Sequence, residues 1–416
     1  MKRLIFISLL CTCGIIYSQQ FNIGAEIRPR YENRHGYKAL MEENTDGSHS
    51  ISQRTRLTFN YSDESMKAKV SLQNVRNWGD VSTLSSSDDK SSLHEAWAEA
   101  KLGNKLSLKL GRQEIAYDDH RIFGNVGWAQ QARSHDAMLL KIKPSAKQSV
   151  HLGFALNTDA STATDELYSG VAGYKSFQYL WYHGKFNKLG VSVLLLNTGN
   201  EYEDANEDQI IDYMQTFGPR VTYRSQKIDL SGSFYYQTGK YEAVDINALY
   251  YGLNAGYKIN SNFKLSAGYE FLSGKDQDDN TPEINTFSPL FGTNHKFNGW
   301  MDYFYVGYSN PTGLHDISAT LGYKTGKFFI KAIPHFFSSD GKIFNPGNGE
   351  EMDKNLGTEI DLAMGYKLAK DIKVSAGFSK MFGTETLEIL KGGDKDQNSA
   401  WGWVMFTFTP ELFRTN

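Results

Sequence analysis

The amino-acid sequence predicts an all-β protein, an 18-stranded antiparallel transmembrane β-barrel with short periplasmic turns and long extracellular loops. Three observations lead to this fold class. Apolar and polar residues alternate with a period of two along most of the chain, short and long connections alternate, and many predicted strands have one charged face. Because such strands average to a polar hydropathy, 40% apolar residues coexist with a negative mean hydropathy.

The composition argues against two other classes of protein. The one long apolar run, Leu4–Tyr17, has about 14 residues, fewer than the ~20 that a transmembrane helix needs. The 24 Tyr, 25 Phe and 7 Trp residues argue against a disordered chain, because disordered chains are poor in aromatic residues. A large soluble β-protein that is secreted remains as an alternative.

Residues 1–18 are predicted to be a secretory signal peptide, and residues 19–416 a single outer-membrane barrel domain. Lys2 and Arg3 precede the apolar run, and Ser18 supplies a small residue at the cleavage site. Both cysteines lie in this segment, so the mature chain has no disulfide and no zinc–thiolate site. A lipoprotein is less favoured, because neither cysteine follows a small residue.

The charge balance of the mature chain argues against binding to nucleic acid. Removing Lys2 and Arg3 leaves 42 of the 44 Lys and Arg residues against 47 acidic residues. A protein that binds nucleic acid has a surplus of basic residues.

The first strand is predicted at Phe21–Tyr31, where Phe21 and Ile23 lie on an apolar face and Arg28 and Arg30 on a polar one. The same alternation predicts further strands at 249–257, 263–271, 360–367, 372–379 and 401–409. No segment with helical periodicity has a comparable length.

The predicted connections fall into two sizes that alternate along the chain. Short turns are predicted at 62–65, 103–105, 144–148, 187–188, 225–227, 260–262, 325–326 and 369–371. Long loops are predicted at 32–50, 78–91, 117–134, 158–175, 199–212, 239–246, 339–356 and 384–398. The alternation holds only if 273–312 is one further outer loop, which gives eighteen strands with both termini in the periplasm.

Positive side chains on the polar strand faces are the candidate pore-lining residues. They are Arg28, Arg30, Arg54, Arg56, Arg76, Lys109, Arg112 and Arg133. Arg76 and Arg112 face the lumen only if a β-bulge shifts the register after Gln73 and Gly111. Arginines in an aqueous channel attract anions and bind carboxylates through paired N–H donors. In the alternative interpretation, they pair with lumen acids such as Glu26 and Glu95 and brace the wall.

The sequence matches known catalytic, cofactor-binding and metal-binding motifs poorly or not at all. The sequence has no Gly-x-Ser-x-Gly, phosphate loop or dinucleotide pattern, and His94-Glu95 lacks the second histidine of a zinc helix. We therefore predict no enzymatic activity and no cofactor. Two loops have the spacing that begins a calcium loop, without its glycine and final glutamate. These weak candidates are Asp276, Asp278, Asn280, Asp394, Asp396 and Asn398.

Several segments together resemble the alginate-export family of outer-membrane porins. They are Gln53–Leu57, Leu72–Gly79, Leu93–Trp97, Leu110–Ile115, Trp128–Ala137 and His295–Phe304. The resemblance covers most of the mature chain. It implies an eighteen-stranded barrel whose electropositive constriction passes an anionic polysaccharide, which is mannuronate-rich alginate in the namesake members.

The sequence therefore predicts a monomeric porin in the cell outer membrane, surrounded by outer-membrane lipid, which passes an anionic or polar polysaccharide or oligosaccharide through an arginine-lined lumen. Alginate is a candidate substrate. The alternative is a barrel for surface binding or structure, plugged by the loops at 117–134 and 273–312.

Overall fold

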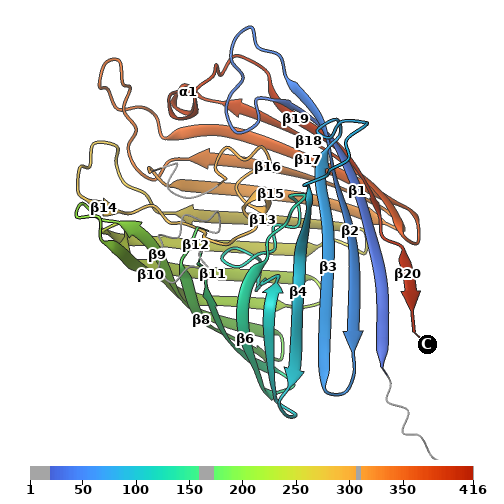
Figure 1. The fold of residues 1–416 in the computed structure, drawn as a ribbon. Helices are drawn as coiled ribbons and strands as arrows, with labels where there is room; N and C mark the ends of the chain where they lie inside the picture. The colour runs from blue at the N-terminus through green and yellow to red at the C-terminus, as the bar shows by residue number, and fades with distance from the viewer. Residues whose placement is uncertain (1–18, 159–172, 306–310, 416) are drawn as a thin grey trace, which may run out of the picture.

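The chain forms a closed antiparallel β-barrel (Figure 1). The computed structural model describes residues 19–158, 173–305 and 311–415, so the predicted signal peptide lies outside the described residues. The first nine barrel strands are β1 Gln20–His35, β2 Ser48–Ser62, β3 Met66–Asn77, β4 Ser91–Lys101, β5 Leu106–Gln113, β6 His135–Ser145, β7 Gln148–Leu156, β8 Ser176–Phe186 and β9 Leu189–Glu203. The other nine are β10 Gln209–Arg224, β11 Ile228–Tyr241, β12 Val244–Lys258, β13 Phe263–Leu272, β15 Leu314–Thr325, β16 Phe328–Ser338, β17 Asn355–Ala369, β18 Ile372–Gly383 and β19 Ser399–Phe408.

Pairing between the first and last strands closes the barrel, since β1 pairs with both β2 and β19. Two short strands lie outside this ring. β14 (Glu283–Ile284) pairs in parallel with β12, and β20 (Glu411–Arg414) continues the pairing along the start of β1. The prediction of eighteen antiparallel barrel strands is therefore confirmed.

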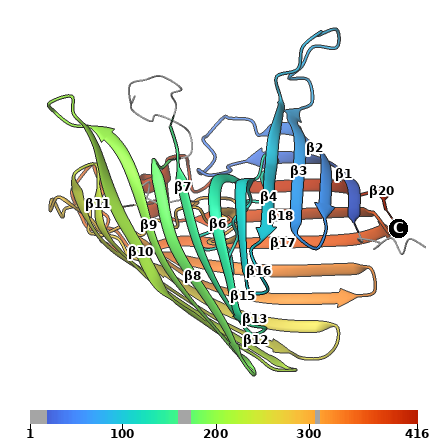
Figure 2. The same cartoon turned by 60° about the horizontal axis from the view of Figure 1, so that its bottom comes forward.

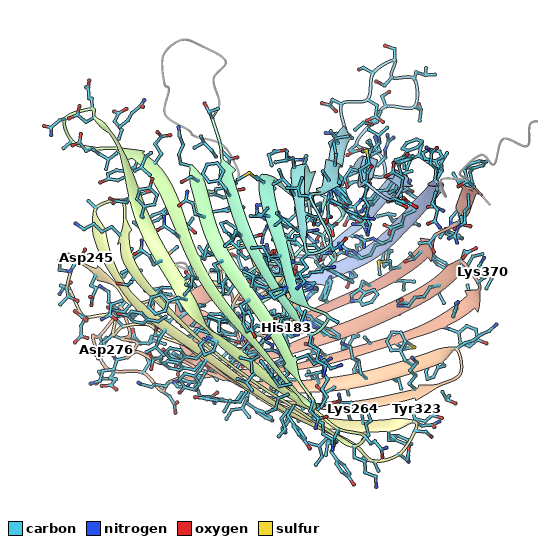
Figure 3. All side chains as sticks on the ribbon, turned by 90° about the horizontal axis from the view of Figure 1, so that it is seen from below. His183, Asp245, Lys264, Asp276, Tyr323 and Lys370 are labelled. Carbon is cyan, nitrogen blue, oxygen red and sulfur yellow. The ribbon has the colours of Figure 1, made fainter. Side chains whose placement is uncertain are left out.

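The two-residue alternation places apolar side chains outward and polar side chains inward. In β17, Asp361 is fully buried while its neighbour Leu362 is 40% exposed. Figure 2 shows the ring of strands, and Figure 3 shows the side chains inside it. In Figure 3, Lys264, Tyr323 and Lys370 lie at the strand ends predicted to be periplasmic. Such an outward apolar band is what contact with lipid requires.

The strand bounds agree with all eight predicted short turns, but two predicted outer loops were too long. The loop predicted at 199–212 is mostly strand, because β9 and β10 continue to a hairpin at residues 204–208. The loop predicted at 239–246 is a two-residue turn, in which Glu242 and Ala243 both have positive φ. The outward faces of these strands become polar before the strands themselves end. A prediction from polarity alone therefore made the two loops longer than they are.

Two loops fold into the barrel and pair with each other (Figure 1). The first inner loop is residues 114–134. The second inner loop is residues 273–305 together with 311–313, in the stretch that the sequence predicted to be one long loop. Phe123 and Phe291 form a parallel β-bridge. Gly124 N–H donates to Phe291 O at 2.8 Å, and Thr293 N–H donates to His120 O at 2.9 Å. The two loops therefore form one inner layer.

The main apolar core lies between this inner layer and the barrel wall. Phe123 and Phe291 pack with Phe177 and Tyr179 of the wall, and Trp128 packs edge-on against Trp403. Among the described residues, the helices are the short α1 (Glu385–Lys391) and the 3₁₀ turn η1 (Asn294–Lys296). Within the described ranges, no helix is long and apolar enough to cross a membrane.

Candidate functional site

Four arginines on the inward face of β1 and β2 bind the backbone of the first inner loop. We call Arg28, Arg30, Arg54 and Arg56 the basic wall. Arg28 donates to the carbonyl oxygens of Gly127, Trp128 and Ala129 at 2.8, 3.1 and 3.2 Å. Arg30, Arg54 and Arg56 donate to the carbonyl oxygens of Trp128, Gln130 and Gln131 at 2.8, 3.2 and 3.3 Å. The backbone from 127 to 131 is thereby docked on the wall.

Carboxylates balance part of this positive charge. Arg54 pairs with Glu26 at 2.6 Å, Arg30 with Glu32 at 3.0 Å, and Arg56 lies 3.9 Å from Glu114. The side chains of Arg30 and Arg54 are 6% and 5% exposed. These contacts match the alternative interpretation, in which the arginines brace the wall, and add a partner that the sequence did not indicate, the carbonyl groups of an inner loop.

The register shifts predicted after Gln73 and Gly111 are absent, although Arg76 is among the lining residues of a cavity of about 1070 Å³ and Arg112 among those of one of about 750 Å³. The β2–β3 register runs without a shift, so Arg76 lies opposite Gln53 on the outward face and pairs with Asp88. The β5 register is also continuous, and Arg112 pairs with Asp136 at 2.7 Å near the outer rim. The bulge expected near these residues lies instead where β3 pairs with β4.

Lys109 and Arg133 both face inward, but they belong to different parts of the molecule and have different partners. Lys109 Nζ lies 3.9 Å from the ring centre of Trp97. Arg133 belongs to the first inner loop and donates to Gly292 O of the second inner loop at 3.0 Å. Lys109 therefore belongs to the barrel wall, whereas Arg133 joins the two loops.

Acidic residues on the opposite part of the barrel bind the second inner loop. We call Glu270, Asp316 and Glu359, on β13, β15 and β17, the acidic wall. Glu359 accepts from Met301 N–H at 2.8 Å, and Asn298 Nδ2 donates to Glu270 at 2.9 Å and to Asp316 at 3.2 Å. The backbone N–H of Met301 and the side-chain amide of Asn298 thus both donate hydrogen bonds to carboxylates of the wall.

Gly299 fits this contact because it has no side chain. Its φ is +82°, and a Cβ at this position would lie 2.5 Å from Glu359 Oε2. Glycine permits both the left-handed backbone and the close approach.

The inner layer lies between cavities on its two sides. The outer cavity, of about 1070 Å³, is lined by Arg30, Tyr37, Trp128, His295 and Tyr305, among others. The periplasmic cavity, of about 580 Å³, is lined by strands β10 to β13, β15 and β16 and by Asp119, Lys296 and Trp300 of the inner loops. A third cavity of about 750 Å³ lies beside Arg133. Among the described residues, the outer and periplasmic cavities share no lining residue.

The periplasmic cavity contains basic residues that were not singled out as lumen candidates from the sequence, whereas its Asp316 was expected to face the lumen. Its basic residues are Arg220, Arg224, Lys264, Lys296 and Lys331. Its acidic residues are Asp119, Asp229, Glu270 and Asp316. Lys331 Nζ lies 4.3 Å from the ring centre of Trp300. The alternation of Arg220 with Pro219 and Val221, and of Lys331 with its apolar neighbours, was the signal that could have found these cations.

A bulge brings His94, Glu95 and Glu114 together. Ser71 pairs with Glu95 while Leu72 pairs with Leu93, so two adjacent side chains of β4 are buried inside the barrel. The ligand atoms of these three residues lie within 4.8 Å of one another, the one such group within the described ranges. His94 Nε2 lies 2.8 Å from Glu114 Oε1.

Existing partners explain this cluster without a metal. Lys69 pairs with Glu95, and Asn125 donates to Glu114 at 2.9 Å. Burial raises the pKa of Glu114, but the hydrogen bonds from His94 and Asn125 outweigh it and hold the pKa at about 2. Glu114 therefore carries a negative charge that helps dock the first inner loop.

The calcium candidates bond to groups of their own loops and of neighbouring segments. Asp276 accepts from Lys342 N–H at 2.7 Å, and Asn280 donates to the backbone of Asp278. Asp394 accepts from Asp396 N–H at 2.8 Å, and Asn398 contacts His35 through its carbonyl oxygen. In the part of the chain that the structure describes, neither set belongs to a cluster of three convergent ligands.

Comparison with known proteins identifies one family and one fold. The model of a family described as alginate export matches residues 19–401. The crystal structure of OccAB4 of Acinetobacter baumannii is similar over 95% of this chain and 99% of that one, with 14% identity and a TM-score of 0.63. OccK9 (OpdG) of Pseudomonas aeruginosa matches over 94% and 98%, with 13% identity and a TM-score of 0.62. No curated protein sequence matches.

Proposed function

The chain belongs to the alginate-export family of outer-membrane barrels, and from this premise we propose that it passes an anionic or polar saccharide through its lumen. The family and fold place it in the outer membrane and support a channel. The nature of the saccharide, with alginate as one candidate, and the role of the arginines are the proposed part. A monomer surrounded by outer-membrane lipid is the assembly we propose.

One observation carries this proposal: an excess of positive charge on the β1–β2 side of the layer that separates the two cavities, opposite the acidic wall. The basic wall has four guanidinium groups, whereas the carboxylates paired with it are Glu26, Glu32 and Glu114. Charges inside a water-filled barrel act on an ion through their field, even when a backbone segment lies between. The arginines would therefore attract a polyanion through the docked segment 127–131.

The cavities offer the contacts that a sugar chain needs. Trp128 and Tyr305 line the outer cavity, and Trp300 lines the periplasmic cavity beside Lys331. Aromatic faces with polar neighbours suit a sugar ring, which is apolar on its faces and polar at its edge. Carboxylates of the saccharide would exchange partners along the mixed cations and acids of the periplasmic cavity.

Bilayer recording tests the proposal. In a KCl gradient, the protein should conduct and prefer chloride, and uronate oligomers should block the current more strongly than neutral oligomers of equal length. Arg56→Gln combined with Lys331→Gln should weaken both the anion preference and the block. A pore that is indifferent to uronate oligomers would overturn the proposal.

A second function has specific support. The two inner loops are bonded to both walls and to each other, which is the arrangement of a plugged barrel used for surface binding or structure. In that case the intact protein should show no conductance, and removal of residues 118–132 should create one.

A further inference from the structure

A row of polar side chains crosses the outward face of four neighbouring strands. Gln178, Asn197, Gln215 and Thr238, on β8 to β11, are direct cross-strand partners. Asn197 Nδ2 donates to Gln178 Oε1 at 2.8 Å, and Gln215 Nε2 donates to Asn197 Oδ1 at 2.7 Å. These residues alternate with the inward-facing Leu194, Leu196 and Thr216, so they face away from the lumen. We call them the amide row.

The position of the amide row along the barrel places it in the outer half of the membrane. The row continues toward β1 through apolar residues, which are Phe154, Met138, Leu110, Ala98, Ala68, Tyr61 and Phe21. Phe21 lies at the periplasmic start of β1. Strands about 4.8 Å apart and tilted by ~40° rise about 3 Å per strand, which puts Gln178 roughly 20 Å above Phe21 in a band about 25 Å tall.

Apolar residues bound the amide row on both sides. The neighbouring row on the periplasmic side consists of Leu152, Leu180, Leu195 and Phe217. Leu195 is 49% exposed and Phe217 is 39% exposed. On the outer side, Tyr213 and Ile211 of β10 are also exposed. The amide row is therefore not simply the end of the apolar belt, and it lines a groove of about 580 Å³ together with its apolar neighbours.

The hydrogen-bonding capacity of the amide row exceeds its internal bonds. The row uses one N–H of Asn197 and one N–H of Gln215, although each amide has two. The Thr238 hydroxyl has no partner among the described residues. An unsatisfied polar group that faces hydrocarbon is costly, so this surface favours a lipid that brings polar groups to the same depth.

We propose that the amide row and the adjacent apolar row bind a glycolipid of the outer leaflet. The amide and hydroxyl groups near the head of its amide-linked hydroxyacyl chains would bond to Asn197, Gln215 and Thr238. The acyl chain would lie along Leu152, Leu180, Leu195 and Phe217. An ordinary phospholipid has no such amide or hydroxyl in its acyl region, which makes the site selective. The inference does not depend on the transported substrate.

Native mass spectrometry of the full-length mature chain tests this site. The protein is measured in mixed micelles that contain equal amounts of lipid A and phosphatidylethanolamine. It should retain lipid A in preference, and Asn197→Leu with Gln215→Leu should lower that retention at least tenfold. The matched control is Gln53→Leu with Thr55→Leu, which changes outward polar residues of β2 and should leave retention unchanged. If the double variant does not fold, as judged by heat-modifiable gel mobility, Thr238→Val provides the test.

Several results would overturn the inference. Equal retention of both lipids would mean that the groove accepts any acyl chain, and retention unaffected by the substitutions would place the lipid elsewhere. A mass of two chains that the double variant converts to one would assign the row to contact between copies of the protein.

Discussion

The basic wall and the acidic wall hold the two inner loops by opposite chemistry. On β1 and β2, guanidinium groups donate to carbonyl oxygens of segment 127–131. On β13, β15 and β17, carboxylates accept from the Met301 N–H and the Asn298 amide. The positively charged wall thus meets loop groups that accept hydrogen bonds, and the negatively charged wall meets loop groups that donate them. Lumen charge in this protein therefore positions the inner layer.

The largest expected effect comes from removing the basic wall. Arg28→Ala with Arg54→Ala deletes donors to several carbonyl groups, and a hydrogen bond that involves a charged group contributes about 1.5–3 kcal/mol. The first inner loop should leave the wall, so single-channel conductance should rise several-fold. Arg112→Ala is the control, because Arg112 donates to Leu93 O and pairs with Asp136, and not with segment 127–131. Unchanged conductance in the double variant would show that the arginines do not hold the layer.

The acidic wall should respond more selectively. Glu359→Ala leaves the buried Met301 N–H without its acceptor, at a cost of about 1–3 kcal/mol, whereas Glu359→Gln keeps an acceptor oxygen. Limited proteolysis around residue 300 should therefore be faster in the alanine variant than in the glutamine variant. Equal protection of the two variants would contradict the role given to this carboxylate.

A smaller effect is expected at Gly299. Gly299→Ala introduces a left-handed backbone cost of roughly 1–2 kcal/mol and a methyl group against Glu359. Gly326→Ala is the matched control, because Gly326 also has positive φ but its Cβ would meet open space. Thermal unfolding should show a lower melting temperature for the first variant than for the second. The same melting temperature for both would remove the argument for close contact with Glu359.

The smallest expected effect is a pH dependence confined to the first inner loop. The pKa of Glu114 is lowered from 4.5 to about 2, so its charge stabilises the docked loop above about pH 4.5. This stabilisation should decline as the pH falls from 4.5 toward 2. Hydrogen exchange of residues 118–132 should therefore accelerate in that window, and Glu114→Gln should flatten the change. A variant with the same pH profile as the parent protein would contradict this assignment.

The barrel could be predicted from sequence because its two-residue period is local. Phe21 and Arg28 reveal their faces from their neighbours alone, and the parity of the connections identified 273–312 as one loop. The register shifts expected before Arg76 and Arg112 were wrong because a bulge depends on the partner strand, and it lies at His94 rather than after Gln73. Contacts across more than 70 residues, such as Arg28 with Gly127, leave no periodic trace in the sequence.

The lengths of the loops at 199–212 and 239–246 were also overestimated, and the reason is physical. Above the lipid, a strand no longer needs apolar residues on its outward face, so β9 to β12 continue as polar hairpins. The lumen cations of the periplasmic half were not predicted, because the candidate arginines were all taken from the first half of the chain. Arg220 and Lys331 alternate with apolar neighbours in the same way.

The most direct test of the account is single-channel recording of the intact protein beside Arg28→Ala with Arg54→Ala, with and without uronate oligomers. We expect the intact protein to form a small, anion-preferring pore that uronate oligomers block, and the variant to form a larger pore with weaker block. A closed intact protein that opens only in the variant would support a plugged barrel instead. Equal conductance and equal block in both proteins would contradict the claim that the basic wall sets the channel.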